Sequence, residues 1–250
     1  MTTPHGRVFL LDVDNTLLDN DQIVSDLRCR LERQFGVASA SRYWDLFEAR
    51  RCELGYADYL GALQDYRSDS EASRGDGTHL LQMSSFLLDY PFAERLYPRA
   101  LDVIERLNTL GTTVILTDGD VVFQPRKVQR SGLWDAVCGR VLIYIHKEQM
   151  LDSLQRCYPA SHYVMVDDKL RVLAAMKAAL RNSVSTVFTR QGHYAMDPAN
   201  VAAYPGAAIR IEHIGDLLDV DIDALSGPSG PAHVACVQHT ASVGGTTQEK

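Results

Sequence analysis

The chain alternates short apolar runs with longer segments of helical periodicity. The apolar runs occupy residues 8–11, 113–117, 141–145, 163–166 and 185–189, with a weaker run at 207–211. A run of this length, bounded by polar residues, is typical of a strand buried on both faces of a parallel sheet. Parallel strands need helix-sized crossover connections, and helical patterns fill the intervals. The pattern therefore predicts an α/β fold with a Rossmann-like, doubly wound parallel sheet core.

The long interval between the first two runs shows no strand pattern and predicts a small, inserted, all-helical module. Apolar residues recur on one helical face from Ile23 to Phe35, and Gly36 is placed to end that helix. Further helical patterns cover residues 43–54, 56–66 and 79–88, and the polar residues 67–78 predict an exposed loop. From about residue 226 the composition turns to Gly, Pro, Ser and Thr, which indicates a disordered tail.

The first strand leads directly into two carboxylates, Asp12 and Asp14. Open α/β sheets bind their ligands at the carboxyl ends of the strands, where this pair is expected to lie. Neighbouring carboxylates repel each other unless a cation or a proton lies between them, which favours a metal site, an acid/base couple, or both. Taken alone, residues 12–15 are equally typical of a turn or a helix cap. The residues at the other strand ends help to decide between a functional pair and a turn or helix cap.

Three later strand ends carry Thr117, Lys147, and the pair Asp167 and Asp168. Parallel strands bring these ends to one edge of the sheet. Carboxylates from two loops can share a hard cation such as Mg²⁺, while a hydroxyl and an ammonium group can hold phosphate oxygens. A carboxylate can also attack phosphorus and form an acyl phosphate. The set therefore favours metal-assisted phosphoryl chemistry.

These four motifs, in this order and context, resemble those of the haloacid dehalogenase superfamily, phosphatase-type. The resemblance runs from about residue 7 to residue 218, and its most specific part is Asp-Val-Asp-Asn-Thr at residues 12–16. The resemblance implies a Rossmann-like catalytic core of residues 1–17 and 97–225. The helical module, residues 18–96, is similar to the cap of that family, and residues 226–250 remain as the tail.

The resemblance implies roles for the residues that carry the chemistry. Asp12 is expected to attack phosphorus and become the aspartyl phosphate. Asp14 is expected to protonate the leaving alkoxide and then to accept a proton from the attacking water. Thr117 is expected to hydrogen-bond the phosphoryl group, and Lys147 to offset the negative charge on Asp12 and the phosphate.

The same resemblance implies a Mg²⁺ cofactor. Its expected ligands are the Asp12 carboxylate, the Asp14 backbone carbonyl and a carboxylate of the fourth motif. Asp168 is favoured as the direct ligand and Asp167 as its close supporter, although the two roles can be exchanged. Two positions depart from the common family pattern, because Asp118 follows Thr117 and Lys169 follows the acidic pair.

The expected function is Mg²⁺-dependent hydrolysis of a small phosphomonoester. Haloacid dehalogenation is a less favoured alternative, because a leaving halide needs no proton from Asp14. A phosphomutase is excluded less firmly. A phospho-accepting signalling module also groups acids, a Thr and a Lys, but in another order and without an inserted cap. A non-catalytic binding protein on the same fold is the remaining alternative.

Several other prominent side chains have a structural interpretation that we favour over a functional one. A solvated helix face is expected to carry Arg126, Lys127 and Arg130. Packing within the helical module is expected for Trp44, Phe47, Tyr56 and Tyr59. Weaker candidates for contact with a substrate or the site are Arg50, Arg51 and His146.

Net charge and the length of the apolar runs exclude some classes of binding partner and location. The net charge of −7 without a basic block argues against nucleic acid or an anionic membrane surface as a partner. The small cap that the resemblance implies indicates a small phosphorylated metabolite as the partner, with a larger phosphorylated partner at a half-open site as the alternative. No apolar run approaches the roughly 20 residues of a membrane span, and the first residues lack the apolar segment of a signal peptide, so we expect a cytoplasmic protein. The sequence leaves the oligomeric state open.

The five cysteines are widely scattered and show no Cys-x-x-Cys spacing. This pattern indicates neither a disulfide framework nor a zinc site. We expect them to be mostly small buried or partly buried residues.

Overall fold

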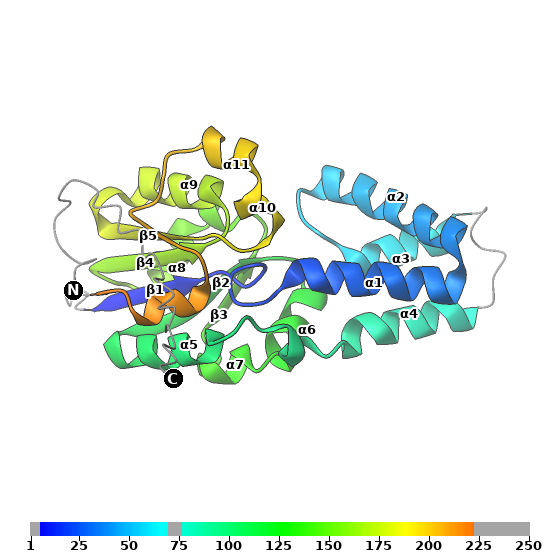
Figure 1. The fold of residues 1–250 in the computed structure, drawn as a ribbon, viewed down its shortest axis with the longest axis horizontal. Coiled ribbons are helices and arrows are strands. Elements are labelled where there is room, and N and C mark those ends of the chain that lie inside the picture. The colour runs from blue at the N-terminus through cyan, green and yellow to red at the C-terminus, as the bar shows by residue number, and fades with distance from the viewer. Residues whose placement is uncertain (1–5, 70–76, 223–250) are drawn as a thin grey trace, which may run out of the picture.

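Parallel strands form one six-stranded sheet in the computed structural model, which describes residues 6–69 and 77–222 (Figure 1). The strands are β1 (Arg7–Leu11), β2 (Thr112–Asp118), β3 (Val141–Tyr144), β4 (His162–Asp167), β5 (Val184–Thr189) and β6 (Ile209–Ile211). Their order across the sheet is β3-β2-β1-β4-β5-β6. The chain therefore runs outward from β1 on one side and from β4 on the other, which confirms the doubly wound α/β fold and puts a topological switch point between β1 and β4.

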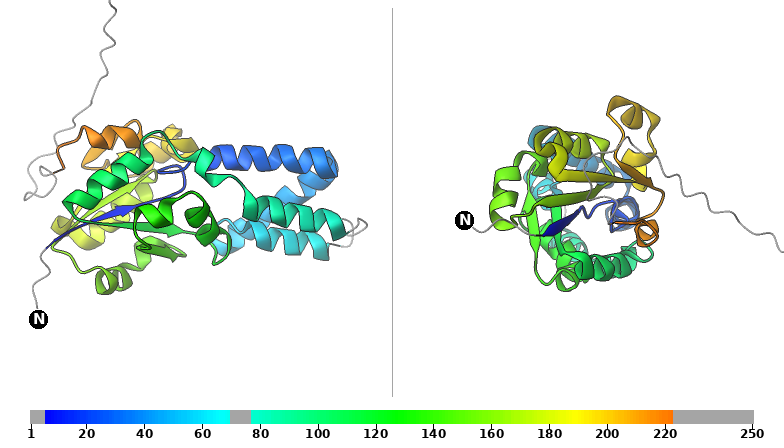
Figure 2. Two further views of the ribbon diagram at one scale, coloured as in Figure 1. Left: turned by 90° about the horizontal axis from the view of Figure 1, so that it is seen from below. Right: turned by 90° about the vertical axis from the view of Figure 1, so that its left-hand side faces the viewer.

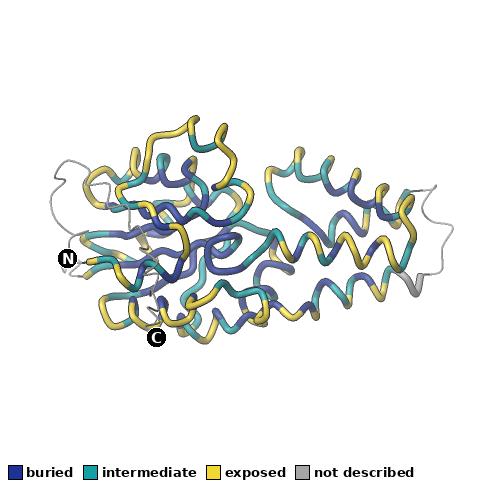
Figure 3. Tube along the Cα trace, viewed as in Figure 1, coloured by how far each residue is buried: buried dark blue, intermediate teal, exposed yellow. Residues whose placement is uncertain are grey.

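Helices cover both faces of the sheet because the strands are apolar on both sides. Phe9 and Leu11 of β1 pack in one core cluster with α5 (Ala100–Leu110). Val8 and Leu10 point to the opposite face and pack with α8 (Leu151–Cys157) and α9 (Leu170–Leu180). Successive strand residues alternate between faces, so a continuous apolar run is what a two-sided sheet requires. Figure 3 shows this central layer as the main buried region of the sheet domain.

Four helices form a bundle beyond the carboxyl ends of the strands (Figures 1 and 2). They are α1 (Asn20–Phe35), α2 (Val37–Leu54), α3 (Tyr59–Ser68) and α4 (Gly77–Asp89). Gly36 ends α1, as its position after Phe35 predicts, and Gly55 ends α2 in the left-handed region with a φ of 78°. The first core cluster continues from the sheet into this bundle, so the two parts share apolar contacts.

Shorter helices complete the described structure. They are η1 (Phe92–Arg95), α6 (Phe123–Arg130), α7 (Leu133–Ala136), η2 (Lys147–Gln149), η3 (Arg181–Ser183), α10 (Gly192–Met196), α11 (Pro198–Ala203) and η4 (Ile214–Leu218). The sequence pattern did not predict α10 and α11, which are too short for a clear periodicity. The connection between β3 and β4 contains η2 and α8 as separate elements. Residues 70–76 of the expected loop, and the expected tail, lie outside the described residues.

The prediction for the cysteines is wrong where it can be checked. Cys29, Cys52, Cys138 and Cys157 are free and exposed, and Cys236 lies outside the described residues. Cys29 illustrates the reason, because it lies two positions after the buried Leu27 and therefore on the opposite side of α1. Within residues 6–69 and 77–222, no helix has both the length and the apolar character needed to span a membrane.

Candidate active site

The candidate active site lies at the carboxyl ends of the central strands, where the sequence predicts it. Asp12 follows β1, and its N–H donates a hydrogen bond of 3.1 Å to the carbonyl of Val166 in β4. This continuation of the strand pairing brings Asp12 beside Asp167 and Asp168, which follow Val166 directly. Residues far apart in the sequence thus become neighbours through the backbone pairing of two parallel strands.

Asp12, Asp167 and Asp168 form a compact cluster of buried carboxylates. Each offers an oxygen atom, and these atoms lie within 4.8 Å of one another. Asp12 Oδ2 and both side-chain oxygens of Asp168 are buried without a hydrogen-bond partner. Burial raises the pKa of Asp168 well above its ordinary value, and the negative charges of Asp167 and Asp12 act in the same direction. Unpaired buried carboxylate oxygens of this kind fit a hard cation.

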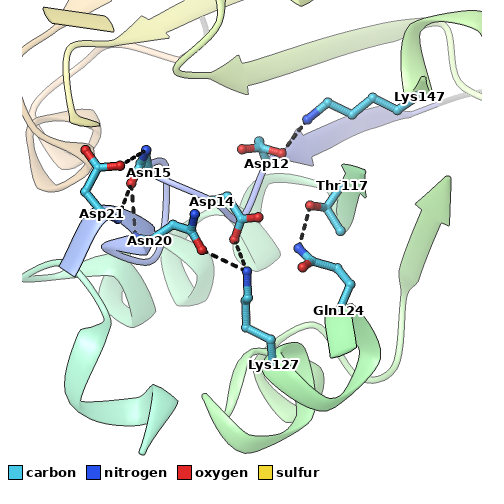
Figure 4. Close-up of polar contacts among 9 residues, drawn as sticks. All are labelled: Asp12, Asp14, Asn15, Asn20, Asp21, Thr117, Gln124, Lys127 and Lys147. Carbon is cyan, nitrogen blue, oxygen red and sulfur yellow. Dashed lines mark hydrogen bonds and ion pairs between the residues drawn. The ribbon is translucent and has the colours of Figure 1, made fainter. Parts of the chain in front are cut away.

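Lys147 supplies positive charge beside this cluster. Its Nζ contacts Asp12 Oδ1, lies 2.8 Å from Asp167 Oδ2 and donates to the carbonyl of Leu116 over 3.2 Å. Burial alone would lower the pKa of this lysine, but the surrounding carboxylates, Asp12 foremost, raise it. Lys147 therefore stays charged and compensates part of the negative charge of the cluster (Figure 4).

Asp118, one of the two departures from the family pattern, holds the loop that carries Lys147. Its Oδ1 accepts a hydrogen bond of 2.7 Å from the backbone N–H of Lys147. Burial raises the pKa of Asp118, while the charge of Lys147 opposes that shift. The other departure, Lys169, is surrounded by acids. Burial would lower the pKa of Lys169, but Asp168, Asp12 and Asp167 raise it. Asp118 therefore adds a carboxylate, and Lys169 adds an ammonium group, to the charged groups around the cluster.

Thr117 is buried at the end of β2, with 1% of its surface exposed, and its hydroxyl has a dedicated partner. The side-chain amide of Gln124, in α6, donates a hydrogen bond of 3.0 Å to Thr117 Oγ1 (Figure 4). Gln124 was not recognised in the sequence. The signal that could have found it is its position one helical turn before Lys127, which places both on one face of α6.

Asp14 turns one of its carboxylate oxygens toward α6. Its Oδ1 lies 2.6 Å from Nζ of Lys127, which also donates a hydrogen bond of 3.0 Å to Asn20 Oδ1 (Figure 4). The expectation that Lys127 belongs to a solvated helix face is wrong, because 1% of its surface is exposed. The neighbouring Arg126 and Arg130 do lie outward and pair with Asp89.

A cavity of about 960 Å³ opens between the strand ends and the helical bundle. Asp14, Lys127 and Asp168 line its floor, and the bundle contributes aromatic and charged walls. Trp44, Phe47 and Tyr59 are buried in a chain of aromatic contacts, as expected, and they also line the cavity, so the same side chains pack the bundle and form part of the cavity wall. Tyr56 is half-buried at the cavity.

The weaker candidates have different positions. Arg50 pairs with Asp58 and Asp65 inside the bundle and does not line the cavity. Arg51 lines the cavity and donates a hydrogen bond of 3.2 Å to the Tyr194 hydroxyl of α10, across the gap between bundle and sheet. His146 lines the cavity too, with a φ of 60°.

Comparison with known proteins agrees with this geometry. A family model described as haloacid dehalogenase-like hydrolase matches residues 7–179. The chain belongs to this hydrolase family. A solved structure from Burkholderia xenovorans, assigned to the haloacid dehalogenase-like hydrolases, is 62% identical, with a TM-score of 0.82 over 87% of this chain and 100% of that chain. The curated proteins gave no match.

More distant members of the family share the fold. An L-2-haloacid dehalogenase from Xanthobacter autotrophicus is 16% identical, with a TM-score of 0.54 over 84% of this chain and 96% of that one. A haloacid dehalogenase-family hydrolase from Bacillus subtilis, solved with bound magnesium, is 18% identical, with a TM-score of 0.54 over 86% of this chain and 98% of that one. At this level of identity the two structures show the shared fold alone.

The carboxylate cluster predicts how stability depends on pH when metal is removed with EDTA. The raised pKa of Asp168 means that the folded protein binds protons more tightly than the unfolded chain. The contribution of Asp168 to the free energy of unfolding therefore falls as pH rises from the ordinary aspartate pKa of 3.8 through the folded value. Asp168→Asn removes this effect, so the variant should be more resistant to urea than the wild type at pH 7, and the difference should vanish toward pH 4.

Exposed Asp135 of α7 offers the matched control, because Asp135→Asn removes a carboxylate that is not buried. Urea titrations of the three proteins at several pH values measure the difference. Equal resistance of the wild type and Asp168→Asn at every pH would contradict the description of Asp168 as a destabilised buried carboxylate.

Proposed function

We propose that this protein is a Mg²⁺-dependent phosphatase that hydrolyses a small phosphomonoester through an aspartyl phosphate on Asp12. The observation that carries the proposal is the cluster of Asp12, Asp167 and Asp168, with buried oxygens that lack partners. A phosphate dianion cannot approach such a cluster without compensating positive charge, whereas a metal ion satisfies the free oxygens and attracts the phosphate.

The donor set fits Mg²⁺ because all its atoms are oxygens. Asp12 and Asp168 would hold the ion through their unpaired carboxylate oxygens. Asp167 is engaged already, since its Oδ1 accepts from the N–H of Lys169 over 2.8 Å and its Oδ2 pairs with Lys147. This supports Asp168 as the direct ligand and Asp167 as a supporter. Asp14, whose side chain faces Lys127, would contribute its backbone carbonyl.

The chain's own residues can carry the first half of the reaction. Asp12 attacks phosphorus, so an oxygen–phosphorus bond forms as the ester bond to the leaving oxygen breaks. Lys147 holds Asp12 in place and offsets negative charge on the transferring group. Thr117, with its hydroxyl accepting from Gln124, is free to donate its own proton to a phosphoryl oxygen. Bound Mg²⁺ supplies further charge compensation at this point.

Asp14 acts as the general acid and then as the general base. It donates one to the leaving oxygen, which departs as the alcohol, and the resulting carboxylate then accepts one from the water that attacks the aspartyl phosphate. That attack releases inorganic phosphate and restores Asp12. Asp14 suits this role because it lines the cavity and a quarter of its side chain is exposed, unlike the buried cluster.

Two alternatives within the family remain for the experiment to separate. Displacement of a halide from a haloacid by Asp12 would leave Asp14 with no leaving group to protonate, since a halide departs without a proton. A phosphomutase would return the phosphoryl group to a second hydroxyl instead of to water. The cavity of about 960 Å³ is of the size that holds a small molecule, which supports a small phosphorylated metabolite as the substrate.

A panel of phosphomonoesters and haloacids, assayed with Mg²⁺ and with EDTA, tests the proposed function. Phosphate release from at least one ester should fall by about 100-fold or more with EDTA, and by at least as much in Asp12→Asn, because the nucleophile is lost. No halide release is expected. Phosphate release that withstands both changes, or halide release without phosphatase activity, would contradict the proposal.

The two proposed roles of carboxylates can be separated by metal binding. Asp14→Asn should reduce turnover by about 100-fold or more and leave Mg²⁺ affinity largely intact, because its side chain pairs with Lys127 and not with the cluster. Asp168→Asn should weaken Mg²⁺ binding strongly. Isothermal titration with MgCl₂ measures both affinities, and an equal loss of metal affinity in the two variants would argue against the assignment of Asp14.

A further inference from the structure

Lys127 is a buried lysine outside the four motifs. One per cent of its surface is exposed, although it lies on α6 between the outward-facing Arg126 and Arg130. Lysines are almost never fully buried unless they are paired, because transferring the ammonium group out of water costs several kcal/mol. The burial of Lys127 therefore depends on the partners of its ammonium group.

These partners are Asp14 and the residue that begins the helical bundle. Nζ of Lys127 lies 2.6 Å from Asp14 Oδ1 and donates to Asn20 Oδ1 over 3.0 Å. Asn20 is the first residue of α1, and its N–H donates to Asn15 Oδ1 over 3.0 Å. The ammonium group thus links the loop that carries the proton donor to the first turn of the bundle.

Lys127 contacts only one of the two carboxylate oxygens of Asp14. Oδ1 is bound by Lys127, while the side chain as a whole is 25% exposed and lines the cavity. Figure 4 shows the second oxygen, Oδ2, on the side of Asp12 and Thr117, away from Lys127. One oxygen is therefore fixed and the other faces the space where a leaving group would lie.

The same face of α6 holds a second motif residue. Gln124 lies one turn before Lys127, is also buried, and donates to Thr117 Oγ1. Phe123 and Val128 are buried apolar residues of the same helix. The polar face of α6 therefore supports both the residue that contacts phosphate and the residue that transfers protons.

We propose that Lys127 is a positioning residue that orients the carboxylate of Asp14 for proton transfer to the leaving group. The inference rests on the proposed phosphatase function. Lys127 itself forms no bond to the reacting atoms. It donates a hydrogen bond to Oδ1 and so fixes the carboxyl group, while the proton to be transferred is carried on Oδ2 and passes to the departing oxygen within hydrogen-bond reach. A misplacement of about 1 Å is enough to slow such a step by about 100-fold.

The leaving group provides the test. Dinitrophenolate departs without a proton, whereas an alkoxide needs one. We expect Lys127→Met to lower kcat/KM by roughly 10- to 100-fold for the alkyl phosphate that the wild type hydrolyses fastest. For dinitrophenyl phosphate the loss should stay below about 3-fold, because that ester does not depend on proton donation. The ratio kcat/KM reports the phosphoryl transfer to Asp12, before the later hydrolysis can obscure the effect.

Matched variants identify the cause. Arg130→Met removes a basic side chain from the same helix that pairs with Asp89 at the surface, and should leave both substrates unaffected. Asp14→Asn should show the same dependence on the leaving group as Lys127→Met. Combining these two substitutions should cost little more than Asp14→Asn alone, because both disable one proton transfer.

Asn20→Ala keeps the test decisive if Lys127→Met does not fold, which thermal melting will show. It removes one of the two acceptors of Lys127 and should produce a smaller loss with the same preference for the alkyl ester. Equal losses for the two esters in the folded variant would overturn the inference and assign Lys127 a structural role. A wild-type protein that hydrolyses neither ester would overturn the proposed function, and the inference with it.

Discussion

The charge balance at the carboxyl edge of the sheet is the interaction on which the rest of the site depends. Strand pairing between β1 and β4 forces Asp12, Asp167 and Asp168 together out of contact with water. Lys147 compensates part of their charge, and a hard cation is the natural complement for the oxygens that remain free. The negative charge that remains uncompensated favours a bound cation, and an anionic group can approach such a site only when that positive charge is present.

The helical bundle and α6 together hold Asp14, the proposed proton donor. Asp14 belongs to the catalytic loop, but its side chain is held by Lys127 from α6, and Asn20 of α1 shares that lysine. The proposed nucleophile, Asp12, and the proposed proton donor, Asp14, are therefore held by different parts of the molecule. The cluster around Asp12 is rigid and buried, whereas Asp14 faces the cavity that the bundle encloses. This division fits a reaction in which phosphorus chemistry is constant and the leaving group varies.

The strand-end residues could be predicted from the sequence because a parallel sheet aligns its carboxyl ends whatever the length of the connections. Asp12, Thr117 and Lys147 lie at such ends and reach the same edge. Lys127 could not be predicted in the same way, because its burial depends on how α6 packs against the loop at Asp14, and its neighbours Arg126 and Arg130 are solvated as expected. Helices α10 and α11 were missed because elements of so few residues carry no period.

The most direct measurement is chemical trapping of the intermediate. The protein is mixed with Mg²⁺ and a hydrolysed phosphomonoester, quenched in acid during turnover, and reduced with borohydride, which converts an aspartyl phosphate to homoserine. Mass spectrometry of the proteolytic peptides should find homoserine at position 12, and no such product in Asp12→Asn. Phosphate release during turnover with Asp12 unmodified, or with the label on another residue, would contradict the account.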